Sequence, residues 1–138
     1  MTPAYHGLMA IVSARLADWL DRELRAFWSA HGEDPSTGLR RVAEEWWAMQ
    51  RFPGIEFRDG PSGRRASLRE GPDVWEVAMV AQAYPGDLEG LSEHFGGLIP
   101  RDALTEALAY AEHFKHEIGD WIAENERVGR DLVARAKR

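Results

Sequence analysis

The chain has 138 residues, a formal net charge of −6 and a hydrophobic content of 44%. This length corresponds to one ordinary domain or two very small ones, and the apolar content is sufficient for a packed core, so a disordered chain is not expected. No cysteine is present, which excludes disulfides, cysteine–zinc sites and a thiol nucleophile.

The first twenty residues lack a basic segment followed by a continuous apolar run, so they do not have the pattern of a secretory signal. No apolar run in the sequence is long enough to span a bilayer. With the absence of cysteine, these features predict a soluble cytoplasmic protein that does not use a membrane as a partner.

The charge is distributed unevenly. Residues 1–70 carry 10 Lys/Arg and 10 Asp/Glu, whereas residues 71–138 carry 7 Lys/Arg and 13 Asp/Glu. Bulk binding of nucleic acid needs many cations that neutralise phosphates. A nucleic-acid partner is therefore expected to contact the N-terminal half of the chain.

The N-terminal half has three predicted elements. Residues 9–16 (MAIVSARL) alternate from Val12 onward and predict a short strand. Helical spacing of apolar residues predicts a helix over 18–31, ended by Gly32, and a second helix over 36–50. The apolar stripe of the second predicted helix consists of Leu39, Val42, Ala43, Trp46 and Trp47.

A hairpin and a helical region follow. Segments 55–58 and 65–68 alternate around a Gly-Pro-Ser-Gly turn, which predicts a β-hairpin that links the two halves. Beyond it, Asp73 and Asp87 are predicted N-caps of two helices, a further helix starts near Arg101, and a long last helix covers about 114–137. The expected fold is mainly α, with a strand–helix–helix arm over 1–52, a hairpin linker over 53–70 and a helical bundle over 71–138.

The order of elements over residues 9–51 resembles the ribbon–helix–helix family. The resemblance rests on the strand MAIVSARL, the helix DWLDRELRAFWSAHG, and the turn and second helix EDPSTGLRRVAEEWWAM. In that family two chains pair their strands into a ribbon that enters the major groove of DNA. The resemblance implies a homodimer formed through the N-terminal strand and an operator DNA as partner.

Such a ribbon would read DNA through the outward face of its strand. Arg15 can donate to a guanine bidentately, Ser13 can donate or accept, and Ile11 can contact a thymine methyl group. The backbone N–H groups near Ser36 and Thr37 would bind a phosphate. Four further arginines are candidate phosphate contacts, two on the second helix and two on the hairpin: Arg40, Arg41, Arg64 and Arg65.

Two features leave other interpretations of these residues open. The strand carries a single cation, and Glu33 and Asp34 stand close to the predicted phosphate site. The arm is alternatively a dimerisation device without DNA contact, or a strand–helix–helix packed inside one globule. The hairpin arginines are alternatively ordinary solvated surface residues.

From residue 53 onward the chain resembles the domain of unknown function 433 family, whose members include VapB-type antitoxins. The resemblance rests on Val74-Trp75, a short acidic helix ending at Phe95, Leu98-Ile99-Pro100, Ala107-Leu108-Ala109-Tyr110, and Ile118 with Ile122, Asn125 and Glu126. It implies a helix-turn-helix-like bundle and a role beside a toxin in a bacterial toxin–antitoxin pair. Ile99 departs from the pattern, because a hydroxyl residue usually precedes the proline.

The helix from Arg101 is a poor candidate for DNA recognition, because Asp102 and Glu106 would be repelled by phosphates. This half of the chain is therefore expected to be a scaffold or a protein-binding face. An acidic segment can occupy the basic groove of a nuclease toxin by charge complementarity. The last helix is the predicted partner-binding element, through Phe114, Ile118, Trp121 and Ile122; alternatively, it packs only on its own bundle.

No pattern indicates an enzyme. His113 and His116 are spaced to bind a metal, but no third ligand is evident, so neither a metal nor another cofactor is expected. The glycine-rich turns lack the Lys-Ser/Thr of a phosphate loop, and no serine lies in a nucleophile-elbow pattern. The sequence thus predicts an antitoxin-like, DNA-binding regulator, with a protein-interaction module that does not bind DNA as the alternative.

Overall fold

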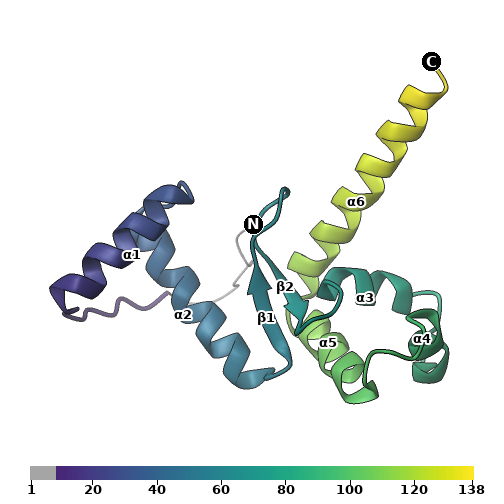
Figure 1. Cartoon of the computed structure of the whole chain (residues 1–138), viewed down its shortest axis with the longest axis horizontal. Helices are drawn as coiled ribbons and strands as arrows, with labels where there is room; N and C mark the ends of the chain where they lie inside the picture. The colour runs from purple at the N-terminus through teal and green to yellow at the C-terminus, as the bar shows by residue number, and fades with distance from the viewer. Residues whose placement is uncertain (1–8) are drawn as a thin grey trace. The chain divides into compact units, whose positions relative to one another are not determined.

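The computed structural model describes residues 9–138 and is mainly helical (Figure 1). The described chain forms two compact units, residues 9–51 and residues 52–138. No helix in either unit is long and apolar enough to cross a membrane. The elements are α1 (Asp18–Ala30), α2 (Pro35–Arg51), β1 (Ile55–Arg58), β2 (Arg65–Leu68), α3 (Val74–Ala81), α4 (Leu88–His94), α5 (Arg101–His113) and α6 (Lys115–Ala136).

The predicted N-terminal strand is not formed. Residues 9–17 have no regular secondary structure and are exposed, with Ile11 97% and Val12 83% accessible. A strand needs a neighbour that satisfies its backbone N–H and C=O groups, and no described segment of this chain pairs with residues 9–16. The strand–helix–helix order was therefore wrong, because the helices come first.

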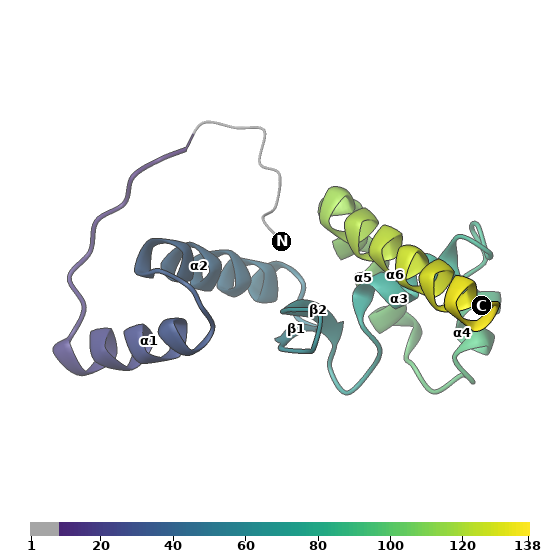
Figure 2. The same cartoon turned by 90° about the horizontal axis from the view of Figure 1, so that it is seen from above.

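The N-terminal unit is a helical hairpin. The helices α1 and α2 lie side by side, joined by a turn at Gly32, whose φ of 69° is the left-handed conformation that favours glycine (Figure 2). At their contact the indole of Trp28 lies directly over Gly38, where an added Cβ would be 2.4 Å from the ring. The close packing of the two helices therefore depends on the missing side chain at Gly38.

The C-terminal unit begins with the hairpin. Its strands lie at the predicted residues and pair in antiparallel register, with Ile55 opposite Leu68 and Arg58 opposite Arg65. Ile55, Ala66 and Leu68 are buried. The hairpin is consequently part of the C-terminal unit, and the boundary between the units lies at residues 51 and 52.

Four helices complete the core of this unit. The helix α5 packs against α3 and α4, and α6 packs against α3 and α5. The predicted cap of α4 is confirmed, since the Asp87 carboxylate accepts a hydrogen bond from the Gly90 backbone N–H at 2.9 Å. The buried apolar side chains of α3 to α6 are Val74, Val77, Leu91, Leu104, Ala107, Tyr110, Ile118 and Trp121.

Candidate functional site

The most buried charged side chain of the described residues belongs to a structural network. Asp73 is 8% exposed, and its carboxylate accepts hydrogen bonds from Ser67 Oγ at 2.6 Å, from Trp75 Nε1 at 3.2 Å and from Arg65 Nε. Asp73 is the N-cap residue of α3, as predicted, but its carboxylate bonds to strand β2 and to Trp75 instead of the helix N–H groups. The network fastens β2 to the start of α3.

Three of the four predicted phosphate-binding arginines are paired with carboxylates. Arg41 donates to Glu33 at 2.6 Å and to Glu45 at 3.1 Å, and the hydrogen bonds that Glu33 accepts raise the pKa of the Arg41 guanidinium. Arg64 lies 3.3 Å from Asp59, and Arg65 is bound to Asp73. A phosphate would have to compete with these carboxylates for each of the three cations.

The predicted phosphate site at the start of α2 is also occupied from within the chain. The backbone N–H of Thr37 donates to Asp34 Oδ1 at 2.8 Å, and this bond lowers the pKa of the Asp34 carboxyl. Ser36 and Arg40 are exposed beside it. Asp34 and Glu33, noted in the sequence as close to this site, therefore act as the cap of α2 and as the partner of Arg41.

The remaining predicted DNA-binding residues lie on the exposed segment before α1. Ile11, Ser13 and Arg15 are exposed, and residues 9–17 form no strand that would align them on one face. Arg64 and Arg65 belong to the C-terminal unit, whereas the other predicted DNA-binding residues belong to the N-terminal unit.

The predicted partner-binding residues of the last helix lie largely in the core of their own unit. Ile118 is 5% and Trp121 8% exposed, while Phe114 and Ile122 are half-buried. Two of the predicted partner-binding side chains, Ile118 and Trp121, are therefore covered within their own unit, where α6 packs against α3 and α5.

The rest of α6 extends past the bundle, as the yellow end of the ribbon shows in Figure 1. We call residues 123–138 the α6 arm; every one of them is exposed. Asn125, near its start, donates to the Met79 sulfur of α3 at 3.7 Å. Val128 and Leu132 follow Trp121 and Asn125 at spacings of three and four residues, so they continue the buried stripe, yet they remain 42% and 60% exposed.

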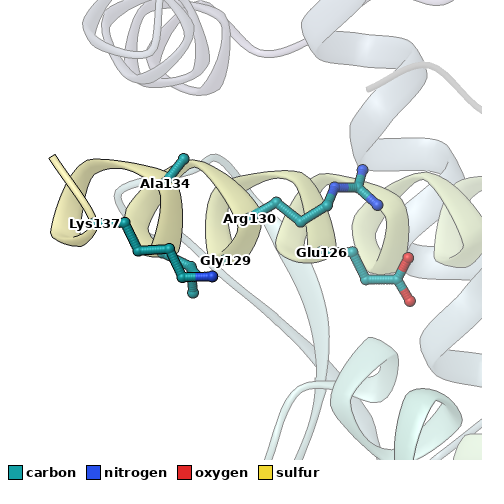
Figure 3. Close-up of a pocket in the computed structure, with 6 residues that line it drawn as sticks. Glu126, Gly129, Arg130, Ala134 and Lys137 are labelled. Carbon is teal, nitrogen blue, oxygen red and sulfur yellow. The ribbon is translucent and has the colours of Figure 1, made fainter.

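A second face of the α6 arm carries a ladder of ion pairs. Arg127 donates to Glu124 at 2.6 Å and to Asp131 at 2.9 Å, and the bond from Arg127 lowers the pKa of the Glu124 carboxyl. Pairs at these spacings stabilise an exposed helix. A shallow hollow lies along another side of the arm, lined among the described residues by Glu126, Gly129, Arg130, Val133, Ala134 and Lys137 (Figure 3).

No arrangement of three or more His, Asp or Glu side chains suited to a metal ion occurs among residues 9–138. The ring of His113 instead contacts Phe52 and Phe114 edge-on, with centroid distances of 6.0 and 4.7 Å. The chain matches no protein-family model, and no curated protein or solved structure is similar enough to count as a relative. The resemblances to the ribbon–helix–helix and domain of unknown function 433 families therefore stay predictions from the sequence.

Proposed function

We propose that the chain is a protein-interaction module that binds a partner protein through the α6 arm. One observation supports this: the stripe that buries Ile118 and Trp121 continues to Val128 and Leu132, which the C-terminal unit leaves exposed. An amphipathic helix whose apolar stripe extends beyond its own bundle is suited to lie in the apolar groove of another protein. The ion pairs of Arg127 stabilise the helix before it binds.

The charge of the α6 arm indicates the chemistry of its partner. Residues 123–138 carry 5 Lys/Arg and 3 Asp/Glu, whereas residues 71–122 carry 2 Lys/Arg and 10 Asp/Glu. The acidic excess of the C-terminal half thus lies on the bundle and not on the arm. The complementary partner offers an apolar groove with an acidic rim to the arm, and basic groups where it approaches the bundle.

A toxin is one form that this partner can take. An antitoxin role, implied by the sequence resemblance, would place the basic groove of a nuclease against the acidic bundle and an apolar groove of the same protein around the α6 arm. The antitoxin role is tested by the same binding measurement, with the protein encoded by the neighbouring gene as the partner.

The double substitution Val128→Glu and Leu132→Glu is expected to abolish partner binding while leaving the bundle folded. Both side chains are exposed in the free chain, so charging them does not disturb the core, whereas it places two carboxylates in the proposed apolar contact. The partner is first isolated on the wild-type chain and purified, and its affinity is then measured by calorimetry for both forms. We expect at least a 100-fold loss of affinity, as for two central contact residues.

The matched control is Arg127→Gln, which changes the charged side of the same helix. It is expected to change affinity by less than about threefold, the effect typical of exposed ion pairs. A shortened chain ending at Glu126 should behave like the double variant, since it retains Ile118 and Trp121 in the core. Undiminished binding by the double variant and by the shortened chain would contradict the proposal.

DNA binding through Ile11, Ser13 and Arg15 is the second candidate function. The observation in its favour is that residues 9–17 are exposed and free of helix, so their side chains are accessible. Arg15→Ala is then expected to weaken binding to a specific palindromic duplex about 5- to 150-fold, the effect of losing one bidentate base contact. A gel-shift titration at moderate salt measures this, and equal binding to specific and random duplex would exclude the function.

A further inference from the structure

The helix α2 buries a polar side and exposes an apolar one. Its buried or largely buried residues recur at spacings of three and four: Gly38 beneath Trp28, the ion-paired Arg41 and Glu45, and Ala48. The side chains of Arg41 and Glu45 are only 19% and 12% exposed. The contact with α1 therefore uses a small residue and an ion pair, where a helical hairpin ordinarily places its apolar stripe.

The apolar stripe of α2 lies elsewhere on the helix. Leu39 is 47%, Val42 38%, Trp46 61% and Trp47 40% exposed, and Ala43 between them is also exposed. These five residues, which we call the α2 stripe, include no charged side chain. The helical spacing of these residues was visible in the sequence, but the N-terminal unit leaves them exposed.

The N-terminal unit is too small to be complete without a further surface. Among residues 9–51 only Trp28, Gly38 and Ala48 are fully buried, and the indole N–H of Trp28 has no hydrogen-bond acceptor in the described chain. Domains of this size without disulfides usually require oligomerisation for stability, and the chain contains no cysteine. The missing core of the unit must come from a surface as apolar as the α2 stripe itself.

We propose that a second copy of this chain covers the α2 stripe, so that two α2 helices pack antiparallel across a two-fold axis. The exposed fractions of the stripe correspond to about 400 Å² of apolar side-chain surface per chain. Two copies supply about 800 Å², and an interface of ordinary apolar content would then total about 1,300 Å², within the range of specific dimers.

The order of residue sizes along the stripe suits this arrangement. The small and medium residues Val42 and Ala43 lie near its middle, and the indoles of Trp46 and Trp47 follow toward the C-terminal end. In an antiparallel pair whose two-fold axis passes near residue 44, each Trp46 lies against Val42 and Ala43 of the partner, and the symmetry makes this contact twice. The absence of charge from the stripe means that two copies meet without like charges facing each other.

The first test is the oligomeric state of the full chain, measured by sedimentation equilibrium. The wild-type chain is expected to be dimeric at micromolar concentration, and Val42→Glu with Trp46→Glu to raise the dissociation constant at least about 30-fold. The matched control is Trp19→Glu on α1, an equally exposed tryptophan (63%) outside the stripe. The control variant is expected to dimerise as the wild type does.

The second test remains decisive if the charged variants fail to fold. Because the natural chain has no cysteine, a single one can be placed in the stripe by Ala43→Cys and, as control, on α1 by Arg22→Cys. A short bismaleimide is expected to yield covalent dimer from the Ala43→Cys chain at least about tenfold faster than from the Arg22→Cys chain, because only the former lies beside its symmetry mate.

Two results overturn the inference. The first is that the wild-type chain stays monomeric at the highest soluble concentration. In that case a second copy of the chain does not cover the α2 stripe. The other is a dimer that neither the charged stripe variant nor the position of the cysteine affects. Both outcomes are independent of the α6 arm, whose partner binding is measured with different variants.

Discussion

Replacing Asp73 with alanine is expected to lower the free energy of unfolding of the C-terminal unit by about 3–5 kcal/mol, the cost of removing one partner from a buried ion pair. Asp73 is 8% exposed and receives hydrogen bonds from three side chains. Its loss leaves the Arg65 guanidinium without its carboxylate and the fully buried Ser67 hydroxyl without an acceptor. Strand β2 and the start of α3 would then separate first.

Hydrogen exchange of the α3 and α5 amides under native conditions measures this loss within the C-terminal unit. The control is Asp59→Ala, which removes a half-exposed carboxylate paired with Arg64 on the same hairpin. Because exposed pairs contribute little, this variant is expected to lose less than about 1 kcal/mol. Equal protection in the two variants would show that the Asp73 network does not fasten the hairpin to the bundle.

Replacing Tyr110 with alanine is expected to cost about 3–5 kcal/mol, as for other large buried aromatic side chains. Tyr110 is 2% exposed, and its ring centroid lies 5.4 Å from Phe52, 6.4 Å from Phe57 and 4.6 Å from Phe114. The ring thus connects α5 with Phe52 in the segment that precedes the hairpin, with Phe57 of β1 and with Phe114 at the start of α6. A cavity at this place loosens all three at once.

Denaturant unfolding followed by far-UV circular dichroism measures the loss, and Tyr110→Phe is the control. The phenylalanine retains the ring contacts, so it is expected to cost about 1 kcal/mol or less. If Tyr110→Ala unfolded at the same denaturant concentration as Tyr110→Phe, the aromatic cluster would not be the centre of this core.

Elements whose signals are local were predictable from the sequence. The hairpin strands were placed at their observed residues because two alternating segments flank a glycine-rich turn of fixed length. The helices α1 and α2 were predicted within about a residue of their ends, since Gly32 and Asp34 mark the end of one helix and the start of the next. These features depend on neighbours in sequence, which a single sequence displays.

Features that depend on a partner in space were not predictable. The alternation of residues 9–16 indicates a strand, but a strand forms only beside a second one, and the described chain provides none. The stripe of α2 indicates one apolar face, but its periodicity does not tell whether α1 or another molecule covers it. The side chains of Ile118 and Trp121 are apolar in the same way as Val128, and only the packing against α3 and α5 distinguishes core from exposed arm.

The cations were the least predictable part of the candidate site. Arg41, Arg64 and Arg65 have the composition of a phosphate-binding cluster, yet each is paired with a carboxylate: Glu33 and Glu45, Asp59, and Asp73. Asp59 is five residues from Arg64, and Glu33 and Asp73 are each eight residues from their arginines. Such spacings have no pattern in the sequence. Two signals were available: the i, i+4 spacing of Arg41 and Glu45 on one predicted helix, and the proximity of Glu33 and Asp34 to the start of α2, which corresponds to the observed contacts.

We propose that the α6 arm binds a partner protein through Val128 and Leu132. The most direct measurement is a calorimetric titration of the purified partner into the wild-type chain, the Val128→Glu, Leu132→Glu variant and the Arg127→Gln control. We expect binding to be lost in the double variant and kept in the control. Equal affinity of the partner for all three chains would contradict it.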